Sequence, residues 1–214
     1  MKLISVWSPC GGAGKTTLSL LLAASLKSRG YKTALIDLTE NNDANDLSQI
    51  GNLNFTVFNS ETMSDKEKKS LNSMDFTIVD YDIETEVMND SAIVVVPVRP
   101  SVFNMKKLND HMEDLSDFPV LPVFNLVESA RKEHQNFYES KSDWATLKNR
   151  AIYERMIENG CTVFSDKAQD WASVKPAMNE VDLIVDLLLY KLEGKLPESK
   201  ERTIKLKEKL GSLS

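Results

Sequence analysis

Residues 8–17, which read SPCGGAGKTT, hold groups that can bind a chain of phosphates. Gly11, Gly12 and Gly14 allow a tight turn in which successive backbone N–H groups point at an anion. Lys15 can place a positive charge beside the β- and γ-phosphates, and the Thr16 hydroxyl can ligate Mg²⁺. The segment therefore has the chemistry to hold a phosphate chain together with its metal ion.

The residues around this turn indicate a strand before it and a helix after it, because the apolar runs 3–7 and 18–24 flank it. The P-loop pattern G-x-x-x-x-G-K-[ST] requires glycine at position 9, where this chain has Pro9, so the match is to a variant. The order strand, glycine turn, helix favours a nucleotide-binding loop over a chance glycine-rich turn. The loop residues predicted to bind the nucleotide are Cys10, Gly11, Gly12, Ala13, Gly14, Lys15, Thr16 and Thr17.

A second signal is the stretch 75–80, DFTIVD, an apolar strand that ends in a carboxylate. Asp80 at that end can hold Mg²⁺ through water beside the Thr16 hydroxyl, so Thr16 and Asp80 are the predicted metal-binding residues. Two alternatives stay open. Asp82 could serve in place of Asp80, or Asp80 could only cap the strand at a turn.

Short apolar runs alternate with helical patterns along the chain, as in βαβ units. The predicted fold class is α/β, a single P-loop NTPase domain with a mostly parallel twisted sheet covered by helices on both faces. We expect strands at 3–7, 33–37, 76–80, 92–98 and 120–124. We expect helices at 15–29, 65–72, 104–115, 142–159 and 179–193.

The composition indicates one domain at residues 1–193, followed by a charged carboxyl-terminal tail at 194–214. The formal net charge of −6 argues against an overall attraction to nucleic acid or anionic lipid, although a local basic patch could provide one. Cys10 and Cys161 have no metal-ligand spacing and suit a reducing cytosol. No apolar run approaches the roughly 20 residues of a membrane span. We therefore expect a cytoplasmic protein, with association with the nucleoid left open.

The glycine pair before x-G-K-T-T resembles the KGGxGKTT loop of the ParA/MinD family of P-loop ATPases, with a variant Walker A motif. The resemblance covers most of residues 1–193 and is closest to small plasmid-partition ATPases of the ParF type. It implies ATP and Mg²⁺ as cofactors, a homodimer that forms on ATP binding, and a small ParB-like or centromere-binding partner protein. It also implies non-specific binding to DNA.

The stretch 33–40, TALIDLTE, resembles the family's D-x-D-P-Q segment. The resemblance implies that Asp37 lies near the Mg²⁺ shell and the switch region, and that Thr39 replaces the aspartate that orients the attacking water. Threonine cannot accept the proton of that water, so hydrolysis should be slow unless Glu40 or Asp43 takes over. The residues assigned to catalysis are Lys15, Asp37, Thr39 and Glu40.

Cys10 stands where the family carries its signature lysine, which reaches the phosphates of the opposite subunit. A cation acting in trans is worth about 10³ to 10⁵ in rate in related phosphoryl transfers. Its loss again predicts a weak ATPase unless Arg99, Lys106 or Lys107 supplies the charge. Proximity to a helix N-terminus also predicts a lowered pKa for the Cys10 thiol, which leaves sensitivity to oxidation open, although simple tolerance of a small residue at this position is the favoured interpretation.

The stretch 122–125, PVFN, resembles the family's strand that ends in a base-contacting asparagine. Asn125 can pair with the adenine edge, and we rank ATP above GTP because Leu126 and Glu128 depart from the guanine-reading N-K-x-D pattern. An asparagine in an ordinary turn is the alternative interpretation.

The resemblance favours a nucleotide-dependent dimerising switch in plasmid or DNA partition, with weak or partner-stimulated hydrolysis. Candidate contacts with DNA phosphates are Arg131, Lys132, Lys148 and Arg150, which could equally be ordinary solvated charges.

Two alternatives to partition stay open. Leu206, Leu210 and Leu213 share a helical face beneath lysines, which keeps a membrane-associated positioning ATPase similar to MinD in view, although the face is small. The other alternative is a non-hydrolysing ATP-binding scaffold that localises a pilus or conjugation apparatus. Because no core periodicity extends past Gly194, we expect deletion of the tail to leave folding and ATP binding intact.

Overall fold

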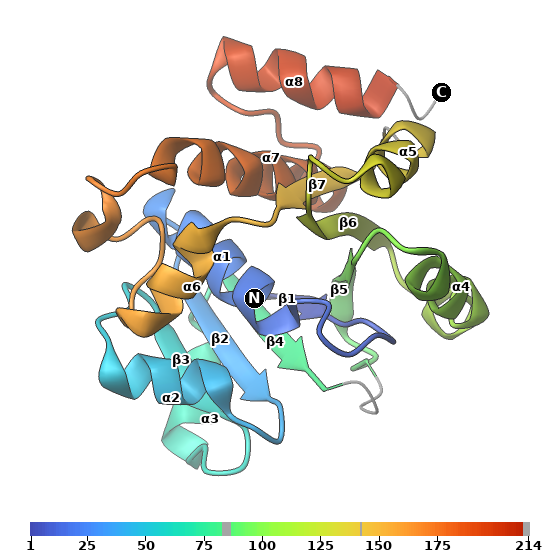
Figure 1. Cartoon of the computed structure of the whole chain (residues 1–214). Helices are drawn as coiled ribbons and strands as arrows, with labels where there is room; N and C mark the ends of the chain where they lie inside the picture. Colours follow the sequence, from blue (N-terminus) through green and yellow to red (C-terminus); the bar gives the residue numbers. More distant parts are fainter. Residues whose placement is uncertain (83–86, 142, 212–214) are drawn as a thin grey trace.

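The computed structural model describes residues 1–82, 87–141 and 143–211, and a seven-stranded parallel sheet forms its centre (Figure 1). The strand order is β3-β2-β4-β1-β5-β6-β7. The strands are β1 (Lys2–Val6), β2 (Thr33–Leu38), β3 (Thr56–Asn59), β4 (Phe76–Tyr81), β5 (Ser91–Val98), β6 (Val120–Val127) and β7 (Ala145–Lys148). This topology confirms the predicted α/β fold, and the sheet is fully parallel where a mostly parallel one was expected.

Helices cover both faces of the sheet, and a separate apolar core lies on each face. One core contains buried side chains of α1, α2, α6, α7 and α8, and the other contains those of α3 and α4. The helices are α1 (Lys15–Ser28), α2 (Asp43–Ile50), α3 (Asp65–Leu71), α4 (Val102–Asp110), α5 (Lys132–Ser140), α6 (Ala151–Glu158), α7 (Val174–Glu193) and α8 (Lys200–Gly211). Short 3-10 helices lie at Glu113–Leu115 and Asp166–Ala168.

The register of the central strands brings three segments with predicted site residues to one edge of the sheet. Val6 on β1 and Asp37 on β2 both lie opposite Asp80 on β4, the strand between them. Because the strands are parallel, the loops that leave their carboxyl ends emerge side by side. This edge of an open α/β sheet is where such folds bind their ligands.

Helix α1 is buried along almost its whole length, because it lies in the core with the sheet beneath it and α7 beside it. Its Ser25 hydroxyl donates a hydrogen bond of 2.8 Å to Asp182 of α7. Arg29, just past the end of α1, forms ion pairs of 2.8 Å with Asp182 and Asp186 of α7. The helix that carries Lys15 and Thr16 is therefore fixed at its far end by apolar packing and by paired charges.

The helix predicted at 142–159 is wrong in its first half. Ser142 lies outside the described residues, and Ala145–Lys148 forms the edge strand β7 before α6 begins at Ala151. Ala145 and Leu147 are fully buried while Lys148 is exposed, and this alternation is typical of a strand. The sequence prediction also left out β3, α2 and α5.

The tail beyond Gly194 contains a helix that packs on the domain, so the expectation that core contacts end there is wrong. Leu206 of α8 is fully buried in the same core as α1 and α7. Arg202 Nε donates a hydrogen bond of 2.8 Å to Asp186, which is itself buried. Leu206 therefore does not face solvent, and Leu213, the third member of the predicted apolar face, lies outside the described residues. No helix within the described residues is long and apolar enough to cross a bilayer.

Candidate functional site

The glycine turn joins β1 to α1 at the edge of the sheet where Asp37 and Asp80 lie. Gly12 and Gly14 have φ angles of 64° and 78°, in the left-handed region that favours glycine. Gly14 is the N-cap of α1, and its carbonyl accepts the first helical hydrogen bond from Leu18 N at 3.0 Å. No side chain caps this helix start, so the N–H groups of its first turn can point at an anion.

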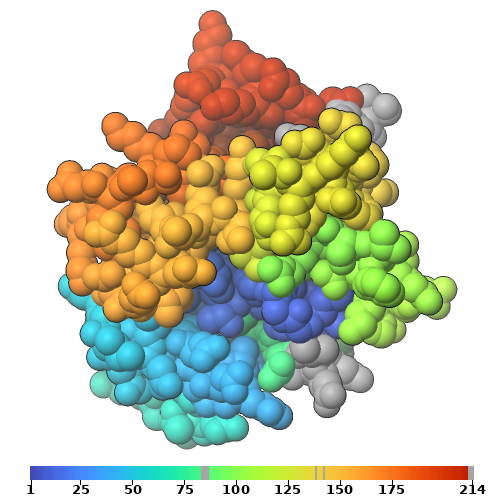
Figure 2. Space-filling view, in the orientation of Figure 1, coloured from blue at the N-terminus to red at the C-terminus, as the bar shows by residue number. Residues whose placement is uncertain are grey.

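The surface over the turn is open on one face of the molecule. Figure 2 shows the blue amino-terminal segment in a hollow between the cyan part of the chain and the green part. Gly11 and Gly12 are exposed, and Lys15, Thr16 and Thr17 are half-buried, whereas Cys10 and Ala13 are buried. The exposed members of the predicted loop can therefore reach a ligand that lies in this hollow.

Asn125, two residues before the end of β6, supports the glycine turn through hydrogen bonds from its side chain. Its side chain is fully buried, and its Nδ2 donates hydrogen bonds to the carbonyls of Ala13 at 2.7 Å and Gly14 at 3.4 Å. Its Oδ1 accepts a hydrogen bond of 3.0 Å from the backbone N–H of Leu126. The amide is thus engaged with the glycine turn, and the predicted contact with adenine stays a prediction.

Asp80 is buried beside the start of α1. Its Oδ1 accepts a hydrogen bond of 3.1 Å from the Ser19 hydroxyl, and the Thr16 side chain lies close enough to lower the pKa of the carboxyl group. Its Oδ2 is buried and has no hydrogen-bond partner among the described residues. Burial raises the pKa of Asp80 from 3.8 to about 7, the Thr16 hydrogen bond opposes this shift, and the nearby charge of Asp37 adds to it.

These residues fit a Mg²⁺ ion. A buried carboxylate oxygen without a partner costs free energy, which a divalent cation beside it would remove. Hard oxygen ligands such as a carboxylate and a hydroxyl are those that Mg²⁺ prefers. Asp82, the alternative ligand, instead accepts a hydrogen bond of 3.5 Å from the backbone N–H of Glu40.

The carboxylate of Asp37 forms hydrogen bonds with the segment that follows β2. Its Oδ1 accepts hydrogen bonds from Thr39 N at 3.0 Å and Thr39 Oγ1 at 2.6 Å. Its Oδ2 accepts hydrogen bonds of 3.0 Å each from the N–H groups of Ala44 and Asn45, in the first turn of α2. The buried carboxylate therefore holds the 39–45 segment against the sheet and caps α2. Glu40, in the same segment, is exposed.

Cys10 points away from the open surface. It is 3% exposed, and its Sγ lies 4.0 Å from the carbonyl of Asn104 on α4. Burial raises the pKa of the thiol, although the charges of Lys107 and Lys15 oppose the shift. The prediction of a lowered thiol pKa is therefore wrong, because the loss of solvent outweighs the nearby positive charges. Arg99, Lys106 and Lys107 are exposed around this part of α4.

The four basic residues proposed for DNA do not form a uniform patch. Arg131 pairs with Glu128 at 2.7 Å, and Arg150 pairs with Glu180 at 2.5 Å. Lys132 and Lys148 are exposed. Because two of the four charges are compensated within the chain, their attraction to DNA phosphates is reduced.

Sequence reasoning missed two residues of the site. Ser19 was not assigned a role, although it lies three residues after Thr16 and so on the same face of α1, where it reaches Asp80. Asn104 was also missed, because nothing in the sequence indicates that α4 packs its carbonyl against the thiol of Cys10. The periodicity of α1 could have identified Ser19.

A family model matches most of this chain. Residues 4–156 match the family model of the CobQ/CobB/MinD/ParA nucleotide-binding domain. No curated protein sequence matches the chain.

Similar solved structures extend over nearly the whole chain. A proposed plasmid partition protein from Borrelia burgdorferi bound to AMPPNP is 18% identical, covers 89% of this chain and 99% of its own, and has a TM-score of 0.64. MinD from Pyrococcus horikoshii with Mg-ADP is 15% identical over 90% of this chain and 99% of its own, with a TM-score of 0.63. The MinC:MinD complex from Aquifex aeolicus is 14% identical over 94% of this chain and 98% of the matched chain, with a TM-score of 0.67. At these identities the structures show a shared fold.

Proposed function

The chain belongs to the CobQ/CobB/MinD/ParA family of nucleotide-binding domains, and from that premise we propose that it is an ATP-dependent dimerising switch in plasmid or DNA partition. ATP with Mg²⁺ would bind at the glycine turn, and the bound form would associate with a second copy. Hydrolysis would be weak or stimulated by a small partner protein. A cytoplasmic location, with association with the nucleoid, is part of this proposal.

The observation that carries the proposal is the buried Oδ2 of Asp80 near the start of α1, which has no hydrogen-bond partner among the described residues. Lys15 and the N–H groups at the start of α1 would bind the phosphates, and the exposed Gly11 and Gly12 would let the phosphate chain approach the backbone. Thr16 and Asp80 would hold Mg²⁺, whose positive charge would offset that of the phosphates. Asp80 would hold it from the protein side, directly or through water.

Slow hydrolysis follows from the chemistry of positions 10 and 39. The Thr39 hydroxyl donates its hydrogen to Asp37, so it offers no base for the attacking water. The Cys10 thiol is buried against α4 and carries no charge toward a second subunit. Glu40 is exposed near the site and is the candidate that could orient a water molecule.

Partition is supported by the kinds of protein that share the fold, one of which is described as a plasmid partition protein bound to AMPPNP. A related MinD occurs in a complex with MinC, which supports a role in which this chain also acts through a partner. For this chain the partner would be a small ParB-like protein. Lys132 and Lys148 remain candidates for contacts with DNA.

The loss of the two groups at positions 10 and 39 also favours a second candidate, an ATP-binding scaffold that does not hydrolyse its nucleotide. A membrane-associated switch receives less support, because Leu206 is buried in the core and Ile204 is the exposed apolar residue of α8.

Two measurements on the same preparation separate these functions. Light scattering should show a monomer without nucleotide and a dimer with Mg·AMPPNP, and steady-state assays should show ATP turnover that rises with DNA and a partner protein. A dimer without any turnover would favour the scaffold. A monomer under both conditions would contradict the proposed switch.

A further inference from the structure

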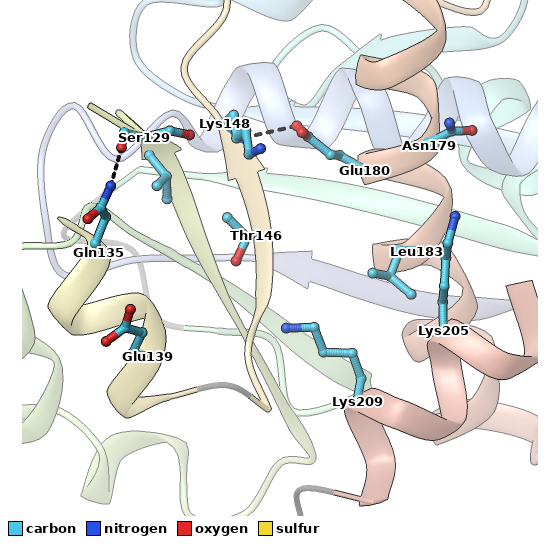
Figure 3. Close-up of a pocket in the computed structure, with 11 residues that line it drawn as sticks. Ser129, Gln135, Glu139, Thr146, Lys148, Asn179, Glu180, Leu183, Lys205 and Lys209 are labelled. Atoms are coloured by element: carbon cyan, nitrogen blue, oxygen red, sulfur yellow. Dashed lines mark hydrogen bonds between the residues drawn. The ribbon is translucent and has the colours of Figure 1, made fainter. Parts of the chain in front are cut away.

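Five buried side-chain polar atoms have no hydrogen-bond partner among the described residues, and Oδ2 of Asp80 is the one carboxylate oxygen in this group. Another of the five, Thr146 Oγ1, belongs to the wall of a cavity of about 500 Å³ between α5, α7 and α8, which no residue of the glycine turn lines (Figure 3). A buried carboxylate oxygen without a partner costs more free energy than a neutral hydroxyl without one. The contacts around Asp80 therefore decide how its second oxygen can be used.

Ser19 holds the first oxygen of this carboxylate. It lies three residues after Thr16, so it is about 4.5 Å further along α1 and on the same face of the helix. Its hydroxyl donates a hydrogen bond of 3.1 Å to Oδ1 of Asp80, and both residues are fully buried. Because solvent reaches neither side chain, water does not replace this contact.

The Ser19 hydrogen bond makes the two oxygens of Asp80 unequal. The torsion about the Cβ–Cγ bond of an aspartate is broad, so the plane of its carboxylate turns easily unless a partner holds it. Turning the plane away from Ser19 would break a hydrogen bond between buried groups, which costs free energy. The contact therefore keeps one oxygen at Ser19 and leaves the other without a partner among the described residues.

Asp37, which lies opposite Asp80 in the sheet, has both of its oxygens engaged. Its carboxylate accepts four hydrogen bonds from the 39–45 segment. Of these two neighbouring carboxylates, Asp80 is therefore the one with an oxygen available to a cation.

We propose that Ser19 is a positioning residue for the metal ligand Asp80, because its hydroxyl holds Oδ1 and thereby directs Oδ2 to Mg²⁺. This inference rests on the proposed binding of ATP with Mg²⁺ at the glycine turn. Ser19 itself touches neither the nucleotide nor the ion. Groups that hold a metal ligand in this way commonly change the metal affinity by about 10- to 100-fold.

Calorimetric titration of AMPPNP into the full chain tests the proposal, once with excess Mg²⁺ and once with EDTA. The ratio of the two dissociation constants measures how much Mg²⁺ strengthens nucleotide binding. Ser19→Ala should lower this ratio about tenfold relative to the wild type. Its affinity for AMPPNP in EDTA should stay unchanged, because Lys15 and the N–H groups of the turn remain.

Ser25→Ala is the matched control. Ser25 is also a fully buried serine of α1, and its hydroxyl donates a hydrogen bond of 2.8 Å to an aspartate, Asp182 of α7, at the far end of the helix. Denaturant titration should show that both variants lose stability. The ratio of dissociation constants should fall in Ser19→Ala and stay at the wild-type value in Ser25→Ala.

The outcomes separate this inference from the proposed function. An unchanged ratio in Ser19→Ala, or an equal loss of affinity with Mg²⁺ and with EDTA, would overturn the positioning role while the ATP site stands. A wild type that binds AMPPNP equally well with and without Mg²⁺ would overturn the metal site and this inference together. A wild type that does not bind AMPPNP at all would overturn the proposed function itself.

Discussion

The side-chain amide of Asn125 donates a hydrogen bond of 2.7 Å to the main-chain carbonyl of Ala13, so β6 supports the glycine turn directly. The fit is close, because a Cβ atom added to Gly14 would lie 2.5 Å from Nδ2 of the same amide. Glycine at position 14 and asparagine at position 125 therefore form a matched pair. Their contact ties the shape of the turn to the neighbouring strand.

This contact predicts that Asn125→Ala weakens binding of ATP and GTP by the same factor. Removing the buried donor leaves the Ala13 carbonyl without that partner, which should cost about 1 to 3 kcal/mol in the free energy of unfolding. Denaturant titration measures the stability, and calorimetry measures both affinities. A loss confined to ATP would instead indicate that Asn125 reads the adenine base.

The raised pKa of Asp80 predicts that the free energy of unfolding of the Mg²⁺-free protein depends on pH. Its pKa is raised from 3.8 to about 7, so the folded state keeps a proton that the unfolded chain releases. The stabilisation is therefore complete below about pH 4 and is lost as the pH rises through about 7. Asp80→Asn should remove this component of the pH profile, whereas Asp110→Asn, an exposed control, should keep it.

Stabilisation by bound Mg²⁺ should have the opposite pH dependence, because Mg²⁺ binds the ionised form of the Asp80 carboxylate. Its stabilising effect on the nucleotide-bound wild type should grow as the pH rises through about 7. Thermal unfolding over this range checks both trends. A profile that is the same in wild type and Asp80→Asn would show that Asp80 is already ionised in the folded protein.

The third prediction concerns hydrolysis. Wild type should turn over ATP more slowly than the double variant Cys10→Lys, Thr39→Asp, because the two new groups restore charge and a water-orienting carboxylate. The effects should be non-additive, since both groups act on one transition state. Each single variant also disturbs a contact of the wild type. Lysine at position 10 would replace a buried thiol, and aspartate at position 39 would replace the hydroxyl that donates to the carboxylate of Asp37.

A steady-state assay of the four combinations decides this point. The binding of ATP and Mg²⁺ should be retained in the wild type, so that binding and turnover separate. Fast turnover by the wild type that the double variant does not increase would show that another group, such as Glu40 or Arg99, already performs these roles.

The fourth prediction concerns α8. Leu206 is fully buried, so Leu206→Ala should lower the free energy of unfolding by about 2 kcal/mol or more. Ile204→Ala, at a residue 50% exposed on the same helix, should change it by less than about 0.5 kcal/mol. Denaturant titration compares the two. Deletion after Gly194 should likewise destabilise the chain, in contrast to the sequence-based expectation, while ATP binding is retained.

The fold, and the places of the candidate site residues within it, could be predicted because their signals are local. The apolar run before Ser8, the glycines and the helical pattern after Lys15 all lie within one βαβ unit, and their physical roles require neighbouring residues. The strand ending at Asp80 could be recognised for the same reason. These segments are confirmed to within one or two residues at their ends.

The remaining features depend on contacts between distant parts of the chain. The edge strand β7 has only four residues, so its alternation is short and is easily included in the longer helical pattern that follows it. Burial of Cys10 depends on α4, and burial of Leu206 depends on the packing of α8 against α7, which no local pattern reveals. Asn125 was identified from its position, but its contact with Ala13 could be seen only in three dimensions.

The most direct test of this account is calorimetric titration of Mg·ATP into wild type, Lys15→Ala and Lys27→Ala. Lys27 is an exposed lysine near the far end of the same helix, so it controls for the loss of a charge from α1. We predict saturable binding by wild type and Lys27→Ala and no measurable binding by Lys15→Ala. Unchanged affinity in Lys15→Ala would contradict the assignment of the glycine turn as a nucleotide site.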